Sequence, residues 1–335
     1  MSCVTQHTRL LAGVLSLLLL GLAGCSSTVP REVLPDDIVT QAELVETPFY
    51  AQELYQCGPA SLAMALGQRG VGVSPDELVE KVYLPERQGS VVPEMVATAR
   101  SYGMVVYELP PSLDALLREV AAGNPVLVLQ NLGFSWWPTW HYAVVIGYDI
   151  EAQRLTLRSG VTERHQVSLG LFDRTWRRGK RWGMVLLPPG ALPASNDHFR
   201  YQKGAYALEQ VGQHEAALSA YRAATEQWPE ESLPWLSRSN LEYRQKRYSE
   251  AEQSLRSALH AIPDAAQLWN NFGYVLMALG CQTEASQAVD CAIALQPEED
   301  GYRQSREEIA GMRAVKRKTP LRCEPVNCPV PARQE

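Results

Sequence analysis

The sequence lacks the features that several common classes of protein require. Its 31 Lys and Arg residues are outnumbered by 37 Asp and Glu residues, which gives a formal net charge of −6 and no electrostatic footprint for nucleic acid. It has no glycine-rich phosphate-binding motif, and its few histidines and cysteines are not spaced as a metal-ligand set. The sequence therefore predicts no nucleic-acid partner, no metal and no cofactor.

Long apolar runs are also scarce, and the one at residues 10–20 is too short to span a membrane. It is followed by Leu-Ala-Gly-Cys at residues 22–25, which resembles the bacterial lipobox. That resemblance implies a signal peptide over 1–24 and a lipid on Cys25, and the serines that follow imply an outer-membrane lipoprotein facing the periplasm. An ordinary cleaved signal or an uncleaved anchor is the alternative.

The chain downstream of the signal is long enough for two domains. Residues 25–47 are polar with scattered prolines and are typical of a tether. Over 48–188, a helical half is followed by short strands rich in valine and leucine, which predicts an α+β domain. The strands are expected in the segments PVLVLQN, HYAVVIGYD, RLTLRSG and WGMVLLP, and residues 189–197 form a linker.

The last third of the chain repeats with a period of 34 residues. Pro229, Pro263 and Pro297 keep this spacing, as does a set of aromatic residues. In each unit an alanine, a large residue and a second alanine, at offsets 0, 4 and 7, also keep it and lie on one helical face. The period and its pattern of small and aromatic residues resemble the tetratricopeptide repeat, which implies three repeats over 198–299 in an all-α solenoid. Residues 300–335 are expected to supply a capping helix and a tail.

Four cysteines remain for the mature chain once Cys3, Cys25 and Cys57 are set aside, and an even number permits disulfides in an oxidising compartment. Cys281 and Cys291 would lie about 15 Å apart along one helix, so they should not pair with each other. The alternatives are a bond between Cys323 and Cys328, or bonds from the tail back onto the repeats.

The candidate chemistry lies in the stretch QCGPASLAMAL, where Cys57 precedes an apolar helix rather than lying within it. A helix N-terminus and a nearby imidazole would lower the pKa of the thiol and populate a nucleophilic thiolate. His141 is the best base, because it opens the strand HYAVVIGYD after the tryptophan-rich GFSWWPTW. His165 lies in a polar stretch between strands, and the other mature histidines fall in or beside the repeats.

These two motifs, in this order, resemble the bacteriocin-processing, double-glycine-type cysteine peptidases of the papain clan. The resemblance covers 48–188 and implies a papain-like fold with Cys57 as the nucleophile and His141 as the general base. It also implies an upstream glutamine as oxyanion donor, for which Gln52 is the first candidate and Gln56 the second.

The sequence departs from that family at the residue that orients the histidine. Asp149 lies eight residues along the strand from His141, about 26 Å away, and cannot touch the ring. A hairpin would place residues 159–162 opposite the histidine, so a hydroxyl on Ser159 or a backbone carbonyl would take this role, with Glu163 just beyond. A serine would stabilise an imidazolium less than a carboxylate does.

Two functions follow from the sequence. The first is a lipid-anchored envelope cysteine peptidase that hydrolyses a peptide or amide bond and recruits protein through its repeats. The alternative is a catalytically weak or inactive peptide-binding scaffold. Trp136, Trp137 and Trp140 are expected to lie partly in the core or to form a cleft wall that grips a peptide.

Overall fold

The computed structural model describes residues 28–52, 56–312 and 323–329. The predicted signal peptide and the lipidation residue Cys25 lie outside these ranges. Within the described part of the chain, no helix is both long and apolar enough to cross a membrane.

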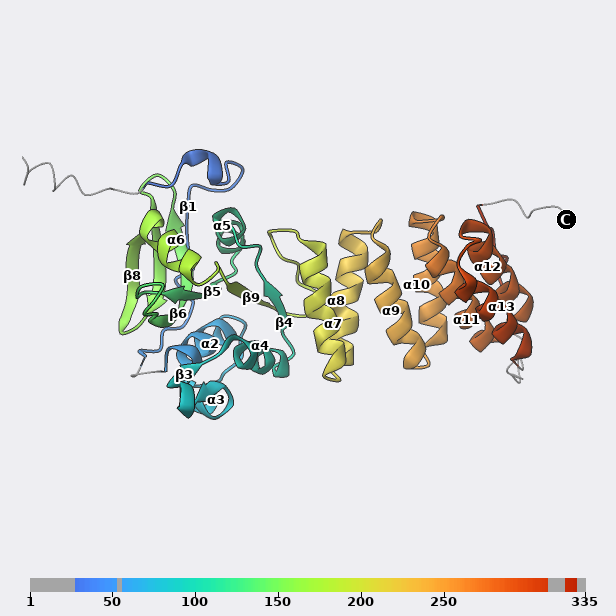
Figure 1. Ribbon diagram of the computed structural model, residues 1–335, viewed down its shortest axis with the longest axis horizontal. Helices are drawn as coiled ribbons and strands as arrows, with labels where there is room; N and C mark the ends of the chain where they lie inside the picture. The colour runs from blue at the N-terminus through green and yellow to red at the C-terminus, as the bar shows by residue number, and fades with distance from the viewer. Residues whose placement is uncertain (1–27, 53–55, 313–322, 330–335) are drawn as a thin grey trace, which may run out of the picture.

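A seven-stranded antiparallel sheet forms the centre of the N-terminal domain (Figure 1). Its strands follow the order β4-β9-β5-β6-β7-β8. The short strand β1 pairs with the C-terminal end of β6, beyond the part of β6 that pairs with β5. The strands are β1 Gln41–Glu43, β4 Val105–Glu108, β5 Val126–Asn131, β6 Trp140–Asp149, β7 Arg154–Ser159, β8 Thr162–Ser168 and β9 Gly183–Leu187. All four strands expected from the sequence are therefore confirmed.

Helices cover both faces of this sheet. The described helices of the domain are η1 Arg31–Val33, α2 Cys57–Gly67, α3 Pro75–Val82, η2 Pro85–Arg87, α4 Val92–Ser101, α5 Leu113–Ala121 and α6 Leu169–Arg178, with a small hairpin of β2 Tyr83–Leu84 and β3 Gly89–Ser90. Alternation along β5 divides the core: Val126 and Val128 pack with α5 and α6, whereas Leu127 packs with α2 and α4. The centre of the sheet is thus buried between helices on its two faces (Figure 1).

Local sequence signals explain where the helices begin. Ser74 accepts a hydrogen bond from the backbone N–H of Glu77 while the Glu77 carboxylate accepts one from the Ser74 backbone, so both sides of a capping box are present at α3. Ser112 caps α5 in the same way by accepting from the backbone N–H of Ala115. Both helix starts were predicted from the sequence and are confirmed.

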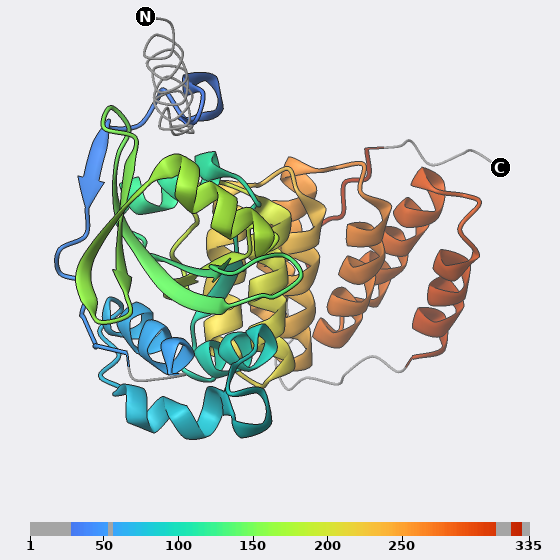
Figure 2. The same ribbon diagram turned by 60° about the vertical axis from the view of Figure 1, so that its left-hand side comes forward.

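Paired helices form the C-terminal third, which extends away from the sheet domain (Figures 1 and 2). They are α7 His198–Gln210, α8 His214–Gln227, α9 Ser232–Arg244, α10 Tyr248–Ala261, α11 Ala266–Leu279, α12 Gln282–Leu295 and the closing α13 Asp300–Gly311. The alanines that keep the 34-residue spacing, Ala217, Ala251 and Ala285, are fully buried where helices meet. The predicted helical solenoid is confirmed.

The first repeat packs directly on the edge of the sheet. A Cβ at Gly204 of α7 would lie 2.7 Å from the carbonyl oxygen of Val106 in β4, so only glycine lets helix and strand approach this closely. Tyr201 and Ala205 share one hydrophobic core with β4, β5 and α5. The two parts of the chain are therefore joined by a continuous core rather than by a linker alone.

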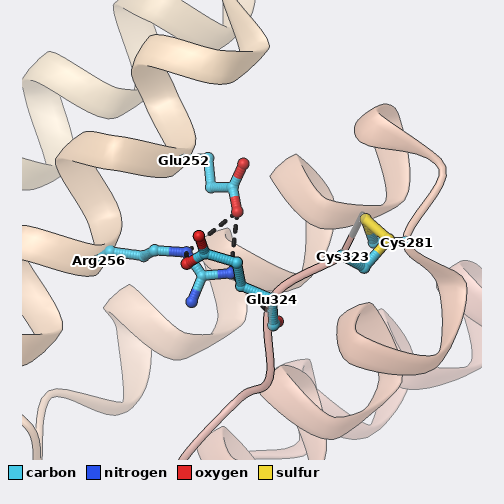
Figure 3. Close-up of a disulfide and its surroundings, with 5 residues drawn as sticks. All are labelled: Glu252, Arg256, Cys281, Cys323 and Glu324. Carbon is cyan, nitrogen blue, oxygen red and sulfur yellow. Dashed lines mark hydrogen bonds and ion pairs between the residues drawn. A yellow bond between two sulfur atoms is a disulfide. The ribbon is translucent and has the colours of Figure 1, made fainter. Parts of the chain in front are cut away.

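Two disulfides attach the C-terminal tail to the last repeat. Cys323 bonds to Cys281 and Cys328 bonds to Cys291, with Cα–Cα distances of 5.6 and 5.7 Å. Figure 3 shows the first disulfide beside Arg256, which pairs with Glu252 and Glu324. Pairing of the tail with the repeats, one of the two alternatives left open by the sequence, is thus the one observed.

Candidate active site

Cys57 is the first residue of α2, with Gln56 as its N-cap. The helix is apolar all round and nearly every residue after Cys57 is buried, so α2 lies inside the domain with its N-terminus at the surface. A Cβ at Gly58 would lie 2.2 Å from the Ser90 hydroxyl, so the glycine allows β3 to pack against the start of the helix. Cys57 is half-buried and is the free thiol among the described cysteines.

His141 and Ser159 come together through the hairpin of β6 and β7. The strands pair antiparallel, with Val144 opposite Arg158, and this register brings the end of β7 beside the start of β6. The Nε2 atom of His141 lies 2.9 Å from the hydroxyl oxygen of Ser159. The sequence-based prediction that a residue of 159–162 would face the ring therefore agrees with the geometry.

Gln52 lies between α2 and β6. Its amide Nε2 donates to the Ser61 hydroxyl at 3.4 Å and to the Tyr142 carbonyl at 3.5 Å, and its backbone N–H donates to the carbonyl of Gly160 at 3.0 Å. The side chain is thereby held one helical turn from Cys57 and next to the strand that carries the histidine.

A cleft of about 800 Å³ exposes these residues to solvent. Gln52, Cys57 and His141 all line it, whereas Gln56 does not, so the geometry favours the first of the two glutamine candidates. One wall is formed by residues 87–92, which run from the end of η2 through β3 to the start of α4, and the other by residues 138–142, which lead into β6. A cysteine at a helix N-terminus, an imidazole and an amide donor therefore share one opening.

The two halves of the chain match two families. Residues 44–181 match the model of the Peptidase_C39 like family, and residues 203–266 and 236–299 match that of the tetratricopeptide repeat. The chain joins a C39-peptidase-like domain to tetratricopeptide repeats. No curated protein matches it.

Solved structures similar to each half have low identity. A C39-like peptidase from Bacillus anthracis has 19% identity over 44% of this chain and 97% of its own, with a TM-score of 0.36. A double glycine motif protease from an AMS/PCAT transporter, in complex with the leader peptide, has 19% identity over 44% of this chain and 96% of its own, with a TM-score of 0.33. The first repeat domain of Spaghetti bound to an HSP90 peptide has 16% identity over 34% of this chain and 90% of its own, with a TM-score of 0.31.

The electrostatics of the C39-like domain differ from the sequence-based expectation. Burial raises the pKa of the Cys57 thiol, and this effect outweighs the lowering by hydrogen bonds from the backbone of Tyr142, Gly58 and Cys57 itself. Burial lowers the pKa of His141, and the charge of His165 lowers it further. The expected lowering of the thiol pKa is therefore wrong, and burial favours the uncharged form of both groups.

No carboxylate of the described residues contacts the His141 ring. Glu163 turns towards Arg158, with 3.6 Å between its carboxylate and the guanidinium, and the Arg158 side chain also donates to the carbonyls of Val45 and Thr47. Asp149 lies at the far end of β6, where it accepts a hydrogen bond from the backbone of Ala152. Ser159 is thus the polar side chain that positions the imidazole.

His165 is part of a strand, not of a loop between strands. It lies in β8, opposite Leu157 of β7, on an edge strand whose residues are mostly exposed. The sequence shows no alternation there because six of the seven residues of β8 are exposed and only Val167 packs against the core. The expectation of a polar connection at this point is therefore wrong.

The three tryptophans beside His141 are exposed rather than partly in the core. Trp136 and Trp137 are 78% and 71% exposed, and Trp140 lines the cleft. Their turn is fixed by Asn131, whose side-chain oxygen accepts hydrogen bonds from the backbone of Gly133 and Thr139. Trp140 therefore forms part of the cleft wall, and the core alternative is wrong for all three.

A metal site does not coincide with this cleft. Among the described residues, the only close group of potential ligands is Cys281, Glu284 and Cys323 in the last repeat, and its two sulfurs are joined in a disulfide. The polar side chains of the cleft itself are a thiol, an imidazole, amides, hydroxyls and a guanidinium. This donor set suits nucleophilic attack on a carbonyl more than binding of a cation.

Proposed function

We propose that this protein is a cysteine peptidase that hydrolyses a peptide or amide bond. The observation that carries the proposal is the cleft in which Gln52, Cys57 and His141 meet, with His141 hydrogen-bonded to Ser159. The match of residues 44–181 to the C39-like family supports the same reaction class.

The contact of Nε2 with Ser159 assigns the roles of the two ring nitrogens. When Nε2–H donates to the serine hydroxyl, Nδ1 is left unprotonated and acts as the general base. Because burial favours the uncharged form of both groups, the Cys57 proton passes to Nδ1 while the sulfur attacks the carbonyl carbon. The oxyanion is met by the Gln52 amide and the backbone N–H of Cys57.

The remaining steps use the same groups. The tetrahedral intermediate collapses to a thioester on Cys57 as the amine leaves with the proton from His141. Water, deprotonated by His141, then attacks the thioester, which releases the carboxylic acid and returns the proton to the sulfur. The Nδ1 atom of His141 therefore carries both the proton that leaves the thiol and the proton that leaves the water.

A direct test measures cleavage of a peptide library by the soluble chain from residue 26 onward, with products identified by mass spectrometry. The peptidase function predicts products from the wild-type protein and none above background from Cys57→Ser or His141→Ala. Products that persist in Cys57→Ser would refute the assigned nucleophile. Peptide binding without cleavage in all three proteins would instead support the inactive scaffold.

We further propose that the protein is an outer-membrane lipoprotein that faces the periplasm and recruits a protein partner through its repeats. The lipobox-like residues 22–25 and the two disulfides of the tail support an envelope location. Membrane fractionation of the full chain against Cys25→Ala tests the anchor, which predicts loss of membrane association in the variant. Retention of the variant in the membrane fraction would contradict a lipid on Cys25.

A further inference from the structure

A second hollow, of about 380 Å³, opens beside the catalytic cleft. The two share Val92, Leu129 and Trp140 in their linings, so they adjoin at these three residues. The far wall of the second hollow includes Arg200 of α7, the first helix of the repeats. We name this hollow, which leads from the cleft to the joint between the two domains, the junction groove.

Basic side chains dominate the charge of the junction groove. Its lining includes Arg178, Lys180, Arg181 and Arg200 and a single acidic residue, Glu108. The carboxylate of Glu108 is already engaged, since it accepts hydrogen bonds from the Lys203 ammonium at 3.2 Å and from the Trp182 indole at 3.3 Å. The acid therefore offers little compensation for the four cations.

Two of the four cations are neutralised by neighbours and two are not. Arg181 pairs with Asp173 at 2.8 Å, and Arg200 pairs with Asp197 at 3.2 Å. Within the described residues, Arg178 and Lys180 have no ion-pair partner, and the Nε of Arg178 is buried without a hydrogen bond. These two side chains present positive charge that the protein itself does not satisfy.

The backbone of the turn that carries these two cations is closely packed. Arg178 and Lys180 flank Gly179, where a Cβ would lie 2.3 Å from the Leu129 carbonyl oxygen, so the turn is packed closely against β5. Lys180 adopts a left-handed conformation with φ 59°, and its backbone N–H donates to the carbonyl of Arg177 at 3.0 Å. The charges are thus carried on a fixed turn beside a strand that also borders the cleft.

The rest of the lining is apolar, with Leu109, Pro111, Leu129, Trp140 and Trp182. We propose that the junction groove binds an acidic segment of the same peptide whose scissile bond lies at Cys57. This proposal rests on the proposed peptidase function, because the groove adjoins the cleft at Val92, Leu129 and Trp140 and one extended peptide would reach both. The catalytic cleft reinforces the preference, since its lining contains Arg87 and no acidic side chain.

The test measures binding, so that it does not depend on turnover. Fluorescein-labelled peptides of about 12 residues, which extend to about 40 Å, carry glutamates in either the N-terminal or the C-terminal third. Each has a counterpart with glutamines in their place. Affinities are measured by fluorescence anisotropy on the Cys57→Ser form of the soluble chain, at low and at high salt.

The matched variants are Lys180→Glu and Lys246→Glu. Both lysines are exposed and both have a left-handed backbone, with φ 59° and 61°, but Lys246 lies between α9 and α10 of the repeats. Arg178→Gln serves as a second variant in the groove. Phosphatidylglycerol vesicles are the probe for an anionic lipid headgroup.

We expect one acidic peptide to bind at least about tenfold more tightly than its glutamine counterpart at low salt. Lys180→Glu and Arg178→Gln should each reduce this preference by about threefold or more, and Lys246→Glu should leave it unchanged. Equal affinities for each matched pair, absence of peptide binding, or a preference that persists in both groove variants would overturn the proposal. Binding of vesicles but not peptides in a Lys180-dependent manner would overturn it in favour of a lipid.

The experiments distinguish a failure of the peptidase proposal from a failure of the proposal that the junction groove binds an acidic segment. An acidic preference that depends on Lys180, without any cleavage by the wild-type chain, would support the groove and refute the peptidase. Cleavage that is indifferent to glutamate or glutamine would support the peptidase and overturn the groove.

Discussion

The hydroxyl of Ser159 lies 2.9 Å from Nε2 of His141, at the position where a carboxylate would give stronger support to an imidazolium. The contact depends on the β6–β7 hairpin, which brings the last residue of one strand beside the first residues of the other. A neutral hydroxyl orients the ring but adds no charge. The site is therefore suited to a neutral thiol–imidazole pair.

Substitutions of Ser159 should separate two effects: the orientation of the His141 ring and the addition of a negative charge beside it. Ser159→Ala is expected to lower kcat by about tenfold, because the imidazole loses the hydrogen bond that fixes its tautomer. Ser159→Asp should raise the pKa of His141, because a carboxylate favours the imidazolium. The control is Thr162→Ala at the start of β8, opposite Ser159, and activity of Ser159→Ala equal to wild type would contradict a role for the hydroxyl.

The pH dependence of activity reports the direction in which the pKa of His141 changes. His141 must be neutral to accept a proton, and burial lowers its pKa, so wild-type activity should persist to pH values below about 6.5. In Ser159→Asp the acid limb of kcat/KM should move to higher pH. A shift to lower pH in this variant would contradict the assignment of His141 as the base.

Cys57 should titrate as a buried thiol. Burial raises its pKa, so the rate of alkylation by iodoacetamide should still be rising above about pH 8.5, the ordinary value for cysteine. Labelling is read at Cys57 by peptide mass spectrometry under non-reducing conditions, which keep the two disulfides intact. A plateau below pH 8 that disappears in His141→Ala would show a preformed thiolate–imidazolium pair instead.

Much of this site was predictable because its residues belong to strong local patterns. Cys57 begins a buried helix, and His141 lies at the start of a mostly buried strand, so both the elements and the candidate residues could be predicted from the sequence. The role of Ser159 was predicted from its position opposite His141 in the expected hairpin. The pairing of β6 with β7 then brought it to the ring.

The rest depends on tertiary packing, which local patterns do not record. The pKa of Cys57 is set by how deeply α2 is buried, and that depth outweighs the helix N-terminus. β8 has no buried face, and β4 is only four residues long, so neither gives a clear strand pattern. The contact of Gly204 with Val106 joins segments almost a hundred residues apart and has no local signal.

Gln52 should matter more than Gln56. Gln52→Ala is expected to lower kcat by about a hundredfold, because an amide donor to the developing oxyanion is lost while substrate binding is kept. Gln56→Ala is the matched control, since this N-cap side chain makes no capping hydrogen bond and lies outside the cleft. Steady-state kinetics of both variants on one cleaved peptide make the comparison, and equal losses would exclude Gln52 as the specific donor.

Gly204 should be intolerant of a side chain. Gly204→Leu is expected to destabilise the protein by about 1–3 kcal/mol or more, because its Cβ alone would lie 2.7 Å from the Val106 carbonyl oxygen. Gly311→Leu is the control, since a Cβ at this position on α13 meets no atom within 4 Å. Urea unfolding measures both variants, and equal stability of the two would contradict close packing between α7 and β4.

The tail disulfides should stabilise the last repeat and leave the peptidase-like domain unaffected. They join residues 42 and 37 positions apart, so their loss in the Cys323→Ser, Cys328→Ser double variant should cost about 2–4 kcal/mol locally. Hydrogen exchange followed by mass spectrometry should then show faster exchange in α11–α13, where Cys281 and Cys291 are buried, and unchanged exchange in β5 and β6. Unchanged protection of α11–α13 would show that the repeats hold together without the tail, whereas faster exchange in the sheet as well would show that stability is shared across the joint at Gly204.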